Sequence, residues 1–332
     1  MTQIQLSHGG GGEETNSLIH DLFYRHFSND ILLAAEDAAV LEVNGRIAFT
    51  TDSFTVNPIF FNGGNIGKLA VAGTVNDLAM MGAEPLYLSA SFIIEEGLLF
   101  DDLERIVKAM AEELEQSEAK IVCGDTKVVP RGAVDKLFIN TSGIGEIRKE
   151  GISAHALLEG HSIIVSGDVG RHGTAILMER EGLGISGELQ SDCATLWPAV
   201  QALIDVDISI SAMRDATRGG LSAVLNEWAV QSSVCLEIEE KQIPVEDAVQ
   251  GICELFGFEA LDLANEGTFI LAVPPEDAPK ALEVLHRLDI TCHAAVIGEV
   301  SMKKPGKVIL HSAYGSSRYL DLPKGELLPR IC

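Results

Sequence analysis

The sequence predicts an α+β protein with two domains and a C-terminal tail. The chain has 332 residues, which is more than one typical domain holds. Strand and helix patterns are mixed in both halves, without the strict alternation of a doubly wound parallel sheet. A polar stretch containing Gly151 and Gly160 separates the halves. We therefore expect domains over residues 1–154 and 155–314, followed by a tail over 315–332.

The first domain is expected to contain a hairpin, further strands and two helices. Residues 40–51 (VLEVNGRIAFTT) predict the hairpin, because Asn44 and Gly45 can adopt the positive φ angles of a type I′ turn. Apolar residues at helical spacing predict helices over residues 68–81 and 101–116. Further strands are expected over residues 86–93, 120–124 and 136–144.

The second domain is expected to repeat this mixture. Residues 161–182 predict a strand, a glycine-rich loop and a helix in succession. Residues 217–230 and 276–288 predict two more helices. Strands are expected in the segments VCLEIEE, TFILAV, CHAAVIGEV and KVILHS.

The tail ends in a cysteine, Cys332, with no residue after it. Pro323, Gly325 and Pro329 forbid a continuous helix, so we expect a flexible tether. A thiol on such a tether is either a chain end without function or a group that has to travel between sites. Prenylation is excluded, because its motif needs further residues after the cysteine.

Composition excludes several classes of partner. The formal net charge of -25 makes the surface repel nucleic acid and anionic membranes. No stretch approaches the ~18 apolar residues of a membrane span, and the first residues lack the pattern of a signal peptide. Six cysteines without a CxxC motif indicate neither a disulfide framework nor a zinc site. We expect a cytoplasmic protein that binds any phosphate through metal ions and backbone N–H groups.

Four aspartates lie beside expected element ends in the first domain: Asp37, Asp52, Asp77 and Asp125. Mg²⁺ takes oxygen ligands and often shares its coordination with substrate phosphates, so carboxylates gathered at one sheet edge would suit it. Taken singly, an aspartate is more typical of a loop or a helix cap. Asp77 is the exception, because it falls inside an apolar helical pattern where aspartate is a poor helix former.

Lys127 follows Asp125 by two residues, so on a strand both side chains point to the same face. A lysine there would neutralise a phosphate or transfer a proton, although a surface lysine is the simpler interpretation. Residues 166–173 (SGDVGRHG) form a glycine-rich loop that opens a helix, where free N–H groups bind anions. The loop matches neither of the common nucleotide-binding motifs.

Two further segments of the second domain carry candidate groups. Residues 214–221 (RDATRGGL) bring Asp215 and the pair Gly219 and Gly220 to the start of a helix. Asp215 is either a ligand or a helix cap. Glu266 lies just before an expected strand, where it is either a general base or a turn residue.

Taken together and in order, the segments GGGG, EDAAV, TTDSF, VNDLAMMGA, GDTKVV, SGDVGRHG, RDATRGG, NEGTF and the terminal PRIC resemble the HypE family of hydrogenase-maturation proteins. That family belongs to the superfamily of aminoimidazole ribonucleotide synthetase and selenophosphate synthetase. The match covers essentially the whole chain, and the PRIC end is what indicates HypE in particular. The resemblance implies a homodimer in which the N-terminal domains pair into a β-barrel.

The resemblance also implies an ATP site with Mg²⁺. The nucleotide site would be lined by Asp37, Asp52, Asp77 and Asp125, which also serve as metal ligands, and by Asp215, Gly219 and Gly220. A carbamoyltransferase, HypF, would load a carbamoyl group onto Cys332. The protein would then use ATP to dehydrate this S-carbamoyl group to S-cyanate, with Lys127 and Glu266 in proton transfer. The cyanide would pass to iron on a HypC–HypD scaffold for [NiFe] hydrogenase.

Two other functions remain open at this stage. One is another ATP-dependent synthetase of the same fold that acts on a free small molecule. Selenophosphate synthetases are expected to carry a reactive Cys or Sec near the N-terminus, whereas the first cysteine here is Cys123. The other is a non-catalytic carrier whose tail docks to maturation partners, and ATP turnover separates this from an enzyme.

Overall fold

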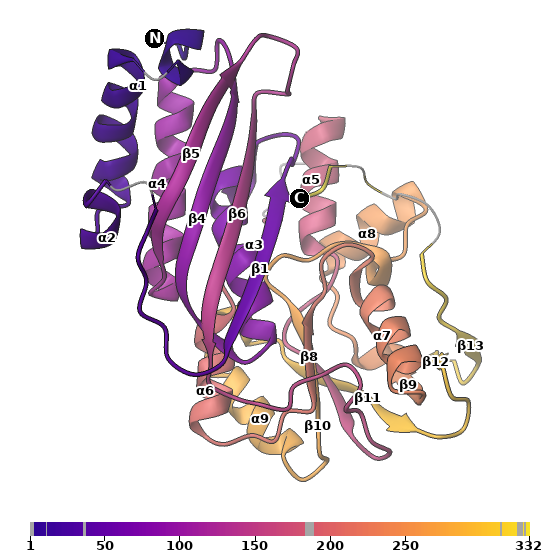
Figure 1. The fold of residues 1–332 in the computed structure, drawn as a ribbon. Coiled ribbons are helices and arrows are strands. Elements are labelled where there is room, and N and C mark those ends of the chain that lie inside the picture. Colours follow the sequence, from indigo (N-terminus) through magenta and orange to yellow (C-terminus); the bar gives the residue numbers. More distant parts are fainter. Residues whose placement is uncertain are drawn as a thin grey trace.

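The computed structural model describes residues 3–10, 12–35, 38–182, 189–312, 314–323, 328 and 330–332. Asp37, Gly325 and Pro329 lie outside the described residues. Two mixed sheets form the centres of the two halves, with the first half above the second in Figure 1. None of the helices in the described ranges is long and apolar enough to cross a membrane.

The first sheet has the strand order β1-β6-β4-β5, with β4 and β5 parallel and the other pairs antiparallel. Its strands are β1 (Ile47–Phe54), β4 (Ala83–Glu95), β5 (Lys120–Val129) and β6 (Leu137–Ile147), with a small ribbon of β2 (Phe60–Phe61) and β3 (Gly64–Asn65) beside it. The helices of this half are η1 (Leu6–Gly9), α1 (Glu13–Leu18), η2 (Ile19–Tyr24), α2 (Asp30–Leu33), α3 (Ile66–Met80) and α4 (Phe100–Ser117).

Helix α3 packs against the first sheet and lies beside α4 (Figure 1), and almost all of its residues are buried. Lys68 and Asp77 are the two residues of α3 that are not. Such a helix is hydrophobic on all sides, as expected for a central element. The half-buried position of Asp77 therefore marks the place where this central helix borders a cavity.

The second sheet has the order β13-β12-β9-β11-β7-β10-β8. Its strands are β7 (Ser162–Val165), β8 (Ala212–Asp215), β9 (Cys235–Glu239), β10 (Phe269–Val273), β11 (Ala295–Ser301), β12 (Lys307–His311) and β13 (Ser317–Tyr319). The surrounding helices are α5 (Arg171–Glu181), α6 (Trp197–Asp205), α7 (Gly220–Gln231), η3 (Glu240–Gln242), α8 (Asp247–Phe256), η4 (Ala260–Asp262), α9 (Ala278–Leu285) and η5 (Asp289–Thr291).

The two halves share one apolar core. Buried residues of α3 and α4 belong to the same hydrophobic cluster as those of α6, including Trp197, Val200 and Leu203. The burial of such side chains is worth roughly 1.5–3 kcal/mol each, so the halves are held in a fixed relation. The shape of the cavities at their junction is consequently set by the fold.

Three sequence predictions are corrected here. The hairpin over residues 40–51 is wrong: Gly45 has the expected positive φ of 70°, but residues 40–46 form no strand and β1 pairs with β6 instead. Asp52 and Asp125 were expected just after their strands, but they lie within β1 and β5, because both strands are longer than predicted. Residues 317–319, inside the range expected to be tail, pair with β12 as the edge of the second sheet.

Candidate active site

A cavity of about 590 Å³ lies at the junction of the two halves, and four carboxylates line it. Asp52 comes from β1, Asp77 from α3, Asp215 from the end of β8, and Glu266 from the loop before β10. We call this the acid cavity. Its volume falls within the ~300–1,000 Å³ that is usual for ligand sites. Four of the residues proposed from sequence are thus gathered at one place.

The first half contributes a carboxylate pair. Thr50 and Asp52 point to the same side of β1, because side chains alternate along a strand. The Thr50 hydroxyl donates a hydrogen bond to Oδ2 of Asp77 at 2.7 Å, which fixes that carboxylate beside Asp52. Burial and the neighbouring Asp77 raise the pKa of Asp52 to about 6.

The second half contributes Asp215 and Glu266 from neighbouring strands. Phe269 pairs with Asp215 in the β10–β8 ladder, which brings the loop before β10 alongside the end of β8. Burial, followed by the Asp77 and Asp52 carboxylates, raises the pKa of Asp215 to about 7. Burial and the Asp215, Asp192 and Asp52 carboxylates raise the pKa of Glu266 well above its usual range.

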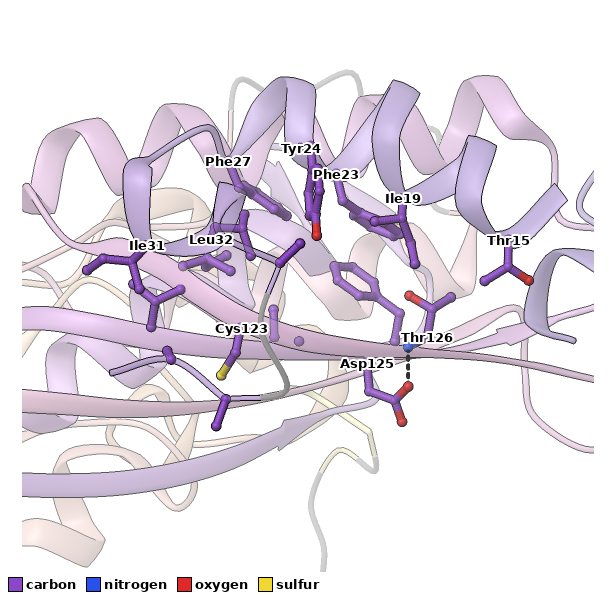
Figure 2. Close-up of a pocket in the computed structure, with 18 of the residues that line it drawn as sticks. Thr15, Ile19, Phe23, Tyr24, Phe27, Ile31, Leu32, Cys123, Asp125 and Thr126 are labelled. Carbon is purple, nitrogen blue, oxygen red and sulfur yellow. Dashed lines mark hydrogen bonds between the residues drawn. The ribbon is translucent and has the colours of Figure 1, made fainter. Parts of the chain in front are cut away.

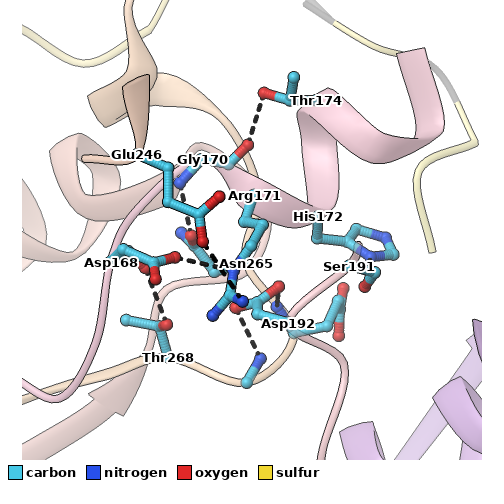
Figure 3. Close-up of polar contacts among 12 residues, drawn as sticks. Asp168, Gly170, Arg171, His172, Thr174, Ser191, Asp192, Glu246, Asn265 and Thr268 are labelled. Atoms are coloured by element: carbon cyan, nitrogen blue, oxygen red, sulfur yellow. Dashed lines mark hydrogen bonds and ion pairs between the residues drawn. The ribbon is translucent and has the colours of Figure 1, made fainter. Parts of the chain in front are cut away.

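The Glu266 carboxyl is buried, and its Oε1 has no hydrogen-bond partner among the described residues. Its backbone is held firmly instead. The two carboxylate oxygens of Asp192 accept hydrogen bonds from the N–H groups of Glu266 and Gly267, at 3.1 and 3.0 Å (Figure 3). A Cβ at Gly267 would come within 1.8 Å of the Asp192 carbonyl, so only glycine fits there. A rigid backbone thus holds the Glu266 carboxyl, with its unpartnered Oε1, at the wall of the acid cavity.

The charge on Asp215 is expected to destabilise the fold. Its pKa is raised from 3.8 to about 7, so above pH 7 the folded state carries a buried charge that the unfolded chain solvates freely. We expect Asp215→Asn to increase the free energy of unfolding at pH 8 by about 1–3 kcal/mol. The gain should shrink as the pH falls below 7 and vanish near pH 4, where both states are protonated. Denaturant unfolding at several pH values measures it, and equal gains at pH 4 and 8 would contradict the buried charge.

The last residue of the chain lies in the acid cavity. Cys332 lines it together with the four carboxylates, and its terminal carboxylate accepts hydrogen bonds from the N–H and the hydroxyl of Thr55, at 3.0 and 3.2 Å. Burial and the nearby Glu266 raise the pKa of the Cys332 thiol to about 12, although Arg218 acts in the opposite direction. In this position the thiol is protonated and therefore a poor nucleophile.

Arg218 is a residue of this site that was not singled out from the sequence. It lines both the acid cavity and an adjoining cavity of about 480 Å³ that runs along the tail. Among the described residues no carboxylate oxygen lies within 4.0 Å of its guanidinium. The only sequence signal was its position inside the RDATRGG loop.

The glycine pair shapes the loop that carries Arg218. Gly219 and Gly220 have positive φ angles of 78° and 58°, which suit glycine. Gly219 lines the adjoining cavity, whereas Gly220 is buried in the first turn of α7. A Cβ at Gly220 would lie 2.5 Å from the carbonyl oxygens of Leu261 and Leu263. The pair therefore positions the loop, and Gly219 alone borders a cavity.

Asp125 and Lys127 lie elsewhere in the single chain. They point to the same face of β5, as their spacing predicted, and form an ion pair at 2.6 Å, in which Lys127 lowers the pKa of Asp125. β5 and β1 are opposite edges of the first sheet, about 14 Å apart at the usual strand spacing. Both residues border a separate cavity of about 370 Å³, whose other side is formed by aromatic residues such as Phe23 and Phe27 (Figure 2).

No metal centre is complete among the described residues of one chain. Across the described ranges, no group of three or more His, Cys, Asp or Glu side chains could hold a metal ion. The chain unites Asp52 and Asp77 but not Asp125, and Asp37 lies outside the described residues. A cation in the acid cavity would therefore need further oxygen ligands from elsewhere.

The glycine-rich loop over 166–173 is not an open anion site. Its Gly170 N–H already donates to Oδ1 of Asn265 at 2.6 Å, and Asp168 is ion-paired with Arg171 at 2.8 Å (Figure 3). Burial raises the pKa of Asp168, while Arg171 lowers it. These internal contacts use the groups that the sequence suggested for an anion.

Comparison with known proteins identifies the class first. Residues 35–147 match the N-terminal domain of AIR synthase related proteins, and residues 159–311 match their C-terminal domain. The two-domain α+β fold expected from the sequence is confirmed.

The particular family follows from full-length relatives. The carbamoyl dehydratase HypE of Escherichia coli K12 is 48% identical over 339 residues, covering 100% of both chains. A solved structure of HypE in complex with ATP has a TM-score of 0.95 at 46% identity and covers 99% of each chain. A solved HypE–HypF complex has a TM-score of 0.81 at 45% identity, covering 92% of this chain and 100% of that one. The chain belongs to the HypE family of hydrogenase-maturation proteins.

Proposed function

We propose that this protein is an ATP-dependent carbamoyl dehydratase that acts on its own C-terminal cysteine. It converts an S-carbamoyl group on Cys332 to S-cyanate, which supplies the cyanide ligand for the iron of [NiFe] hydrogenase. The observation that carries the proposal is the position of the Cys332 thiol among Asp52, Asp77, Asp215 and Glu266. Full-length similarity to carbamoyl dehydratases agrees with it.

The chemistry requires a leaving group and a base. The carbamoyl oxygen leaves poorly, so its attack on the γ-phosphorus of ATP converts it into a phosphate ester and releases ADP. Two N–H protons must also depart, and expulsion of the phosphate then leaves the C≡N triple bond on sulfur. Glu266 is the base that one chain offers beside Cys332, because its oxygen is unpartnered and its raised pKa makes it a stronger base once ionised.

Asp52 and Asp77 fit a Mg²⁺ site. The two carboxylates are close enough for Asp77 to raise the pKa of Asp52, and a divalent cation would relieve that repulsion. Mg²⁺ binds such carboxylates while leaving positions for phosphate oxygens and water. When bound, it would neutralise charge on the triphosphate. Arg218, with a guanidinium that faces two cavities, is suited to the transferred phosphate.

A homodimer would unite the separated residues. The first sheet exposes Ile47 and Phe49, with 51% and 66% of their surface accessible. Asp125 occupies the same row across this sheet as Ser91, Asn140 and Ser53, which share the face away from α3. We propose that this face packs on a second copy as the β-barrel of the family. Asp125 and Lys127 of one subunit would then lie at the interface, where they can serve the neighbouring nucleotide site.

The docked thiol has a consequence for loading. In the acid cavity the Cys332 thiol is largely buried and its pKa is raised to about 12, which makes it a poor nucleophile, so we propose that the tail leaves the cavity to be loaded and then returns. We propose HypF as the donor and a HypC–HypD iron scaffold as the acceptor, in the cytoplasm. A relative solved in complex with HypF supports the first of these partners.

ATP turnover tests the proposed function. Protein loaded with a carbamoyl group should convert one ATP to ADP per loaded chain, because each chain carries one cargo. Unloaded protein should convert almost none, because the phosphoryl acceptor is then missing. Equal ADP formation by loaded and unloaded protein, or none by either, would mean that the protein is not this enzyme.

Asp52→Asn is expected to weaken Mg·ATP binding by about tenfold or more, since it removes one charge from the carboxylate pair. Isothermal titration calorimetry with and without Mg²⁺ measures this. Asp125→Asn should weaken it as well if the dimer brings that residue to the site. Asp207→Asn is the matched control, because Asp207 is exposed, pairs with Lys149 and does not line the acid cavity. Unchanged affinity in Asp52→Asn would contradict the metal role.

A further inference from the structure

The last three residues of the chain are bound through their backbone. Cys332 O accepts from Thr55, as described above, and Arg330 O accepts from the N–H of Asn57 at 3.3 Å. The Ile331 carbonyl accepts from Nε2 of His172 at 2.8 Å. The main-chain oxygens of three consecutive residues therefore each accept a hydrogen bond. These contacts fix which tail residue lies opposite which donor, and so fix the register of the tail.

Two of the donors come from one face of α5. His172 is in its first turn and Arg180 in its last, and residues eight apart lie on the same side of a helix. The Arg180 guanidinium donates both to the carbonyl of Asn57 and to the carbonyl of Arg330. Helix α5 therefore lies along the end of the tail, near the C-terminus marked in Figure 1.

The tautomer of His172 follows from its neighbours. A carbonyl oxygen only accepts, so the proton must be on Nε2, which faces Ile331 O. Burial lowers the pKa of this fully buried ring, so it is neutral and Nδ1 is an acceptor. The Ser191 hydroxyl, at 2.8 Å, donates to Nδ1, and its oxygen accepts from the N–H of Cys193 at 3.0 Å.

The segment that carries Ser191 also supports the proposed base, Glu266. Ser191, Asp192 and Cys193 are consecutive, and Asp192 is the residue that holds the backbone of Glu266 and Gly267 (Figure 3). One short segment thus supports the receptor of the tail on one side and the base on the other.

We propose that His172 and Arg180 are positioning residues that hold the tail in register, so that the group on the Cys332 sulfur meets Glu266. The proposal rests on the proposed function for the identity of that group. Neither side chain touches the sulfur or lines the acid cavity. Among the described residues, the hydrogen bonds of the tail that remain without these two donors are those to Thr55 and Asn57 and those of the Arg330 side chain, and the buried Ile331 still packs in the core.

Matched substitutions separate this role from packing. His172→Asn retains a polar group near Nδ1 for Ser191 but removes the donor to the tail. His172→Gln places an amide N–H near the position of Nε2 and is expected to restore the contact. Arg180→Gln removes the charged donor from the other end of α5.

The first measurement is alkylation of the unloaded full-length protein with iodoacetamide, followed by mass spectrometry of the C-terminal peptide. We expect Cys332 to react about tenfold or more faster in His172→Asn and Arg180→Gln than in the wild type, and at the wild-type rate in His172→Gln. The exposed Cys292, in the second half of the chain, is the internal reference and should react equally in all of them. Unchanged Cys332 reactivity in both His172→Asn and Arg180→Gln overturns the proposal.

The second measurement is ATP-driven dehydration of the loaded protein. The two faster-alkylated variants should lose conversion of S-carbamoyl to S-cyanate, while their Mg·ATP affinity and their loading by the donor stay unchanged. Wild-type conversion in both of them also overturns the proposal. If even the wild type shows no conversion, the proposed function fails, and the alkylation rates still decide whether α5 holds the tail.

Discussion

Cys332→Ala should abolish formation of the cyanate group completely, while Mg·ATP binding stays intact. The variant removes the atom that carries the cargo, but Asp52, Asp77 and Asp215 remain in place. The measurement is the amount of S-cyanate and of ADP formed after incubation with the carbamoyl donor and ATP. Cys292→Ala is the matched control, since Cys292 is an exposed cysteine outside the acid cavity. Product formation by Cys332→Ala, or its loss in Cys292→Ala, would contradict the role of the terminal thiol.

Glu266→Gln should slow dehydration of the loaded protein by about 10²–10⁴-fold, the usual contribution of a general base. Glutamine has the same shape and keeps the backbone contacts to Asp192, so loading and Mg·ATP binding should persist. The loss should therefore fall on the single-turnover rate, measured by rapid quench of loaded protein mixed with ATP.

Glu246→Gln supplies the control for that experiment. Glu246 is an acidic residue of the same half that pairs with Arg171 and does not line the acid cavity. It should keep the wild-type rate. A Glu266→Gln variant that dehydrates its cargo as fast as the wild type would remove Glu266 from the reaction.

Local patterns predicted the two longest helices well, whereas α1, α2, α6 and α8 were not expected from the sequence. Helix α3 was expected over 68–81 and runs Ile66–Met80, and the amphipathic helix α4 was expected over 101–116 and runs Phe100–Ser117. Both have apolar residues at helical spacing over many turns, and that periodicity depends only on neighbours in sequence. The odd position of Asp77 in the first pattern correctly marked a cavity wall.

Pairing between distant strands was not predictable in the same way. Asn44 and Gly45 suggested a hairpin, but the partner of β1 is β6, nearly ninety residues away at the Asp52–Thr141 pair. That Asp125 and Lys127 share one face of β5 followed from strand alternation alone, and their ion pair agrees with it. Their distance from the acid cavity depends on the order of strands across the sheet, which no local pattern encodes.

The support of the site was also invisible in the sequence. Asp192, His172 and Arg180 act through contacts to backbone groups that are far away along the chain, such as Glu266 N–H and Ile331 O. Such contacts leave no motif, because a backbone carbonyl is the same in every residue. The terminal cysteine, by contrast, could be singled out from its position and its proline- and glycine-containing tail.

Mass spectrometry of the C-terminal peptide tests the central claim most directly. The protein is loaded by the carbamoyl donor, freed of donor, and mixed with ATP and Mg²⁺ for one turnover. The account predicts that the carbamoyl mass on Cys332 falls by one water while one ADP appears for each group converted. A carbamoyl group that stays unchanged on Cys332 as ATP is consumed, or a cyanate found on another cysteine, would contradict it.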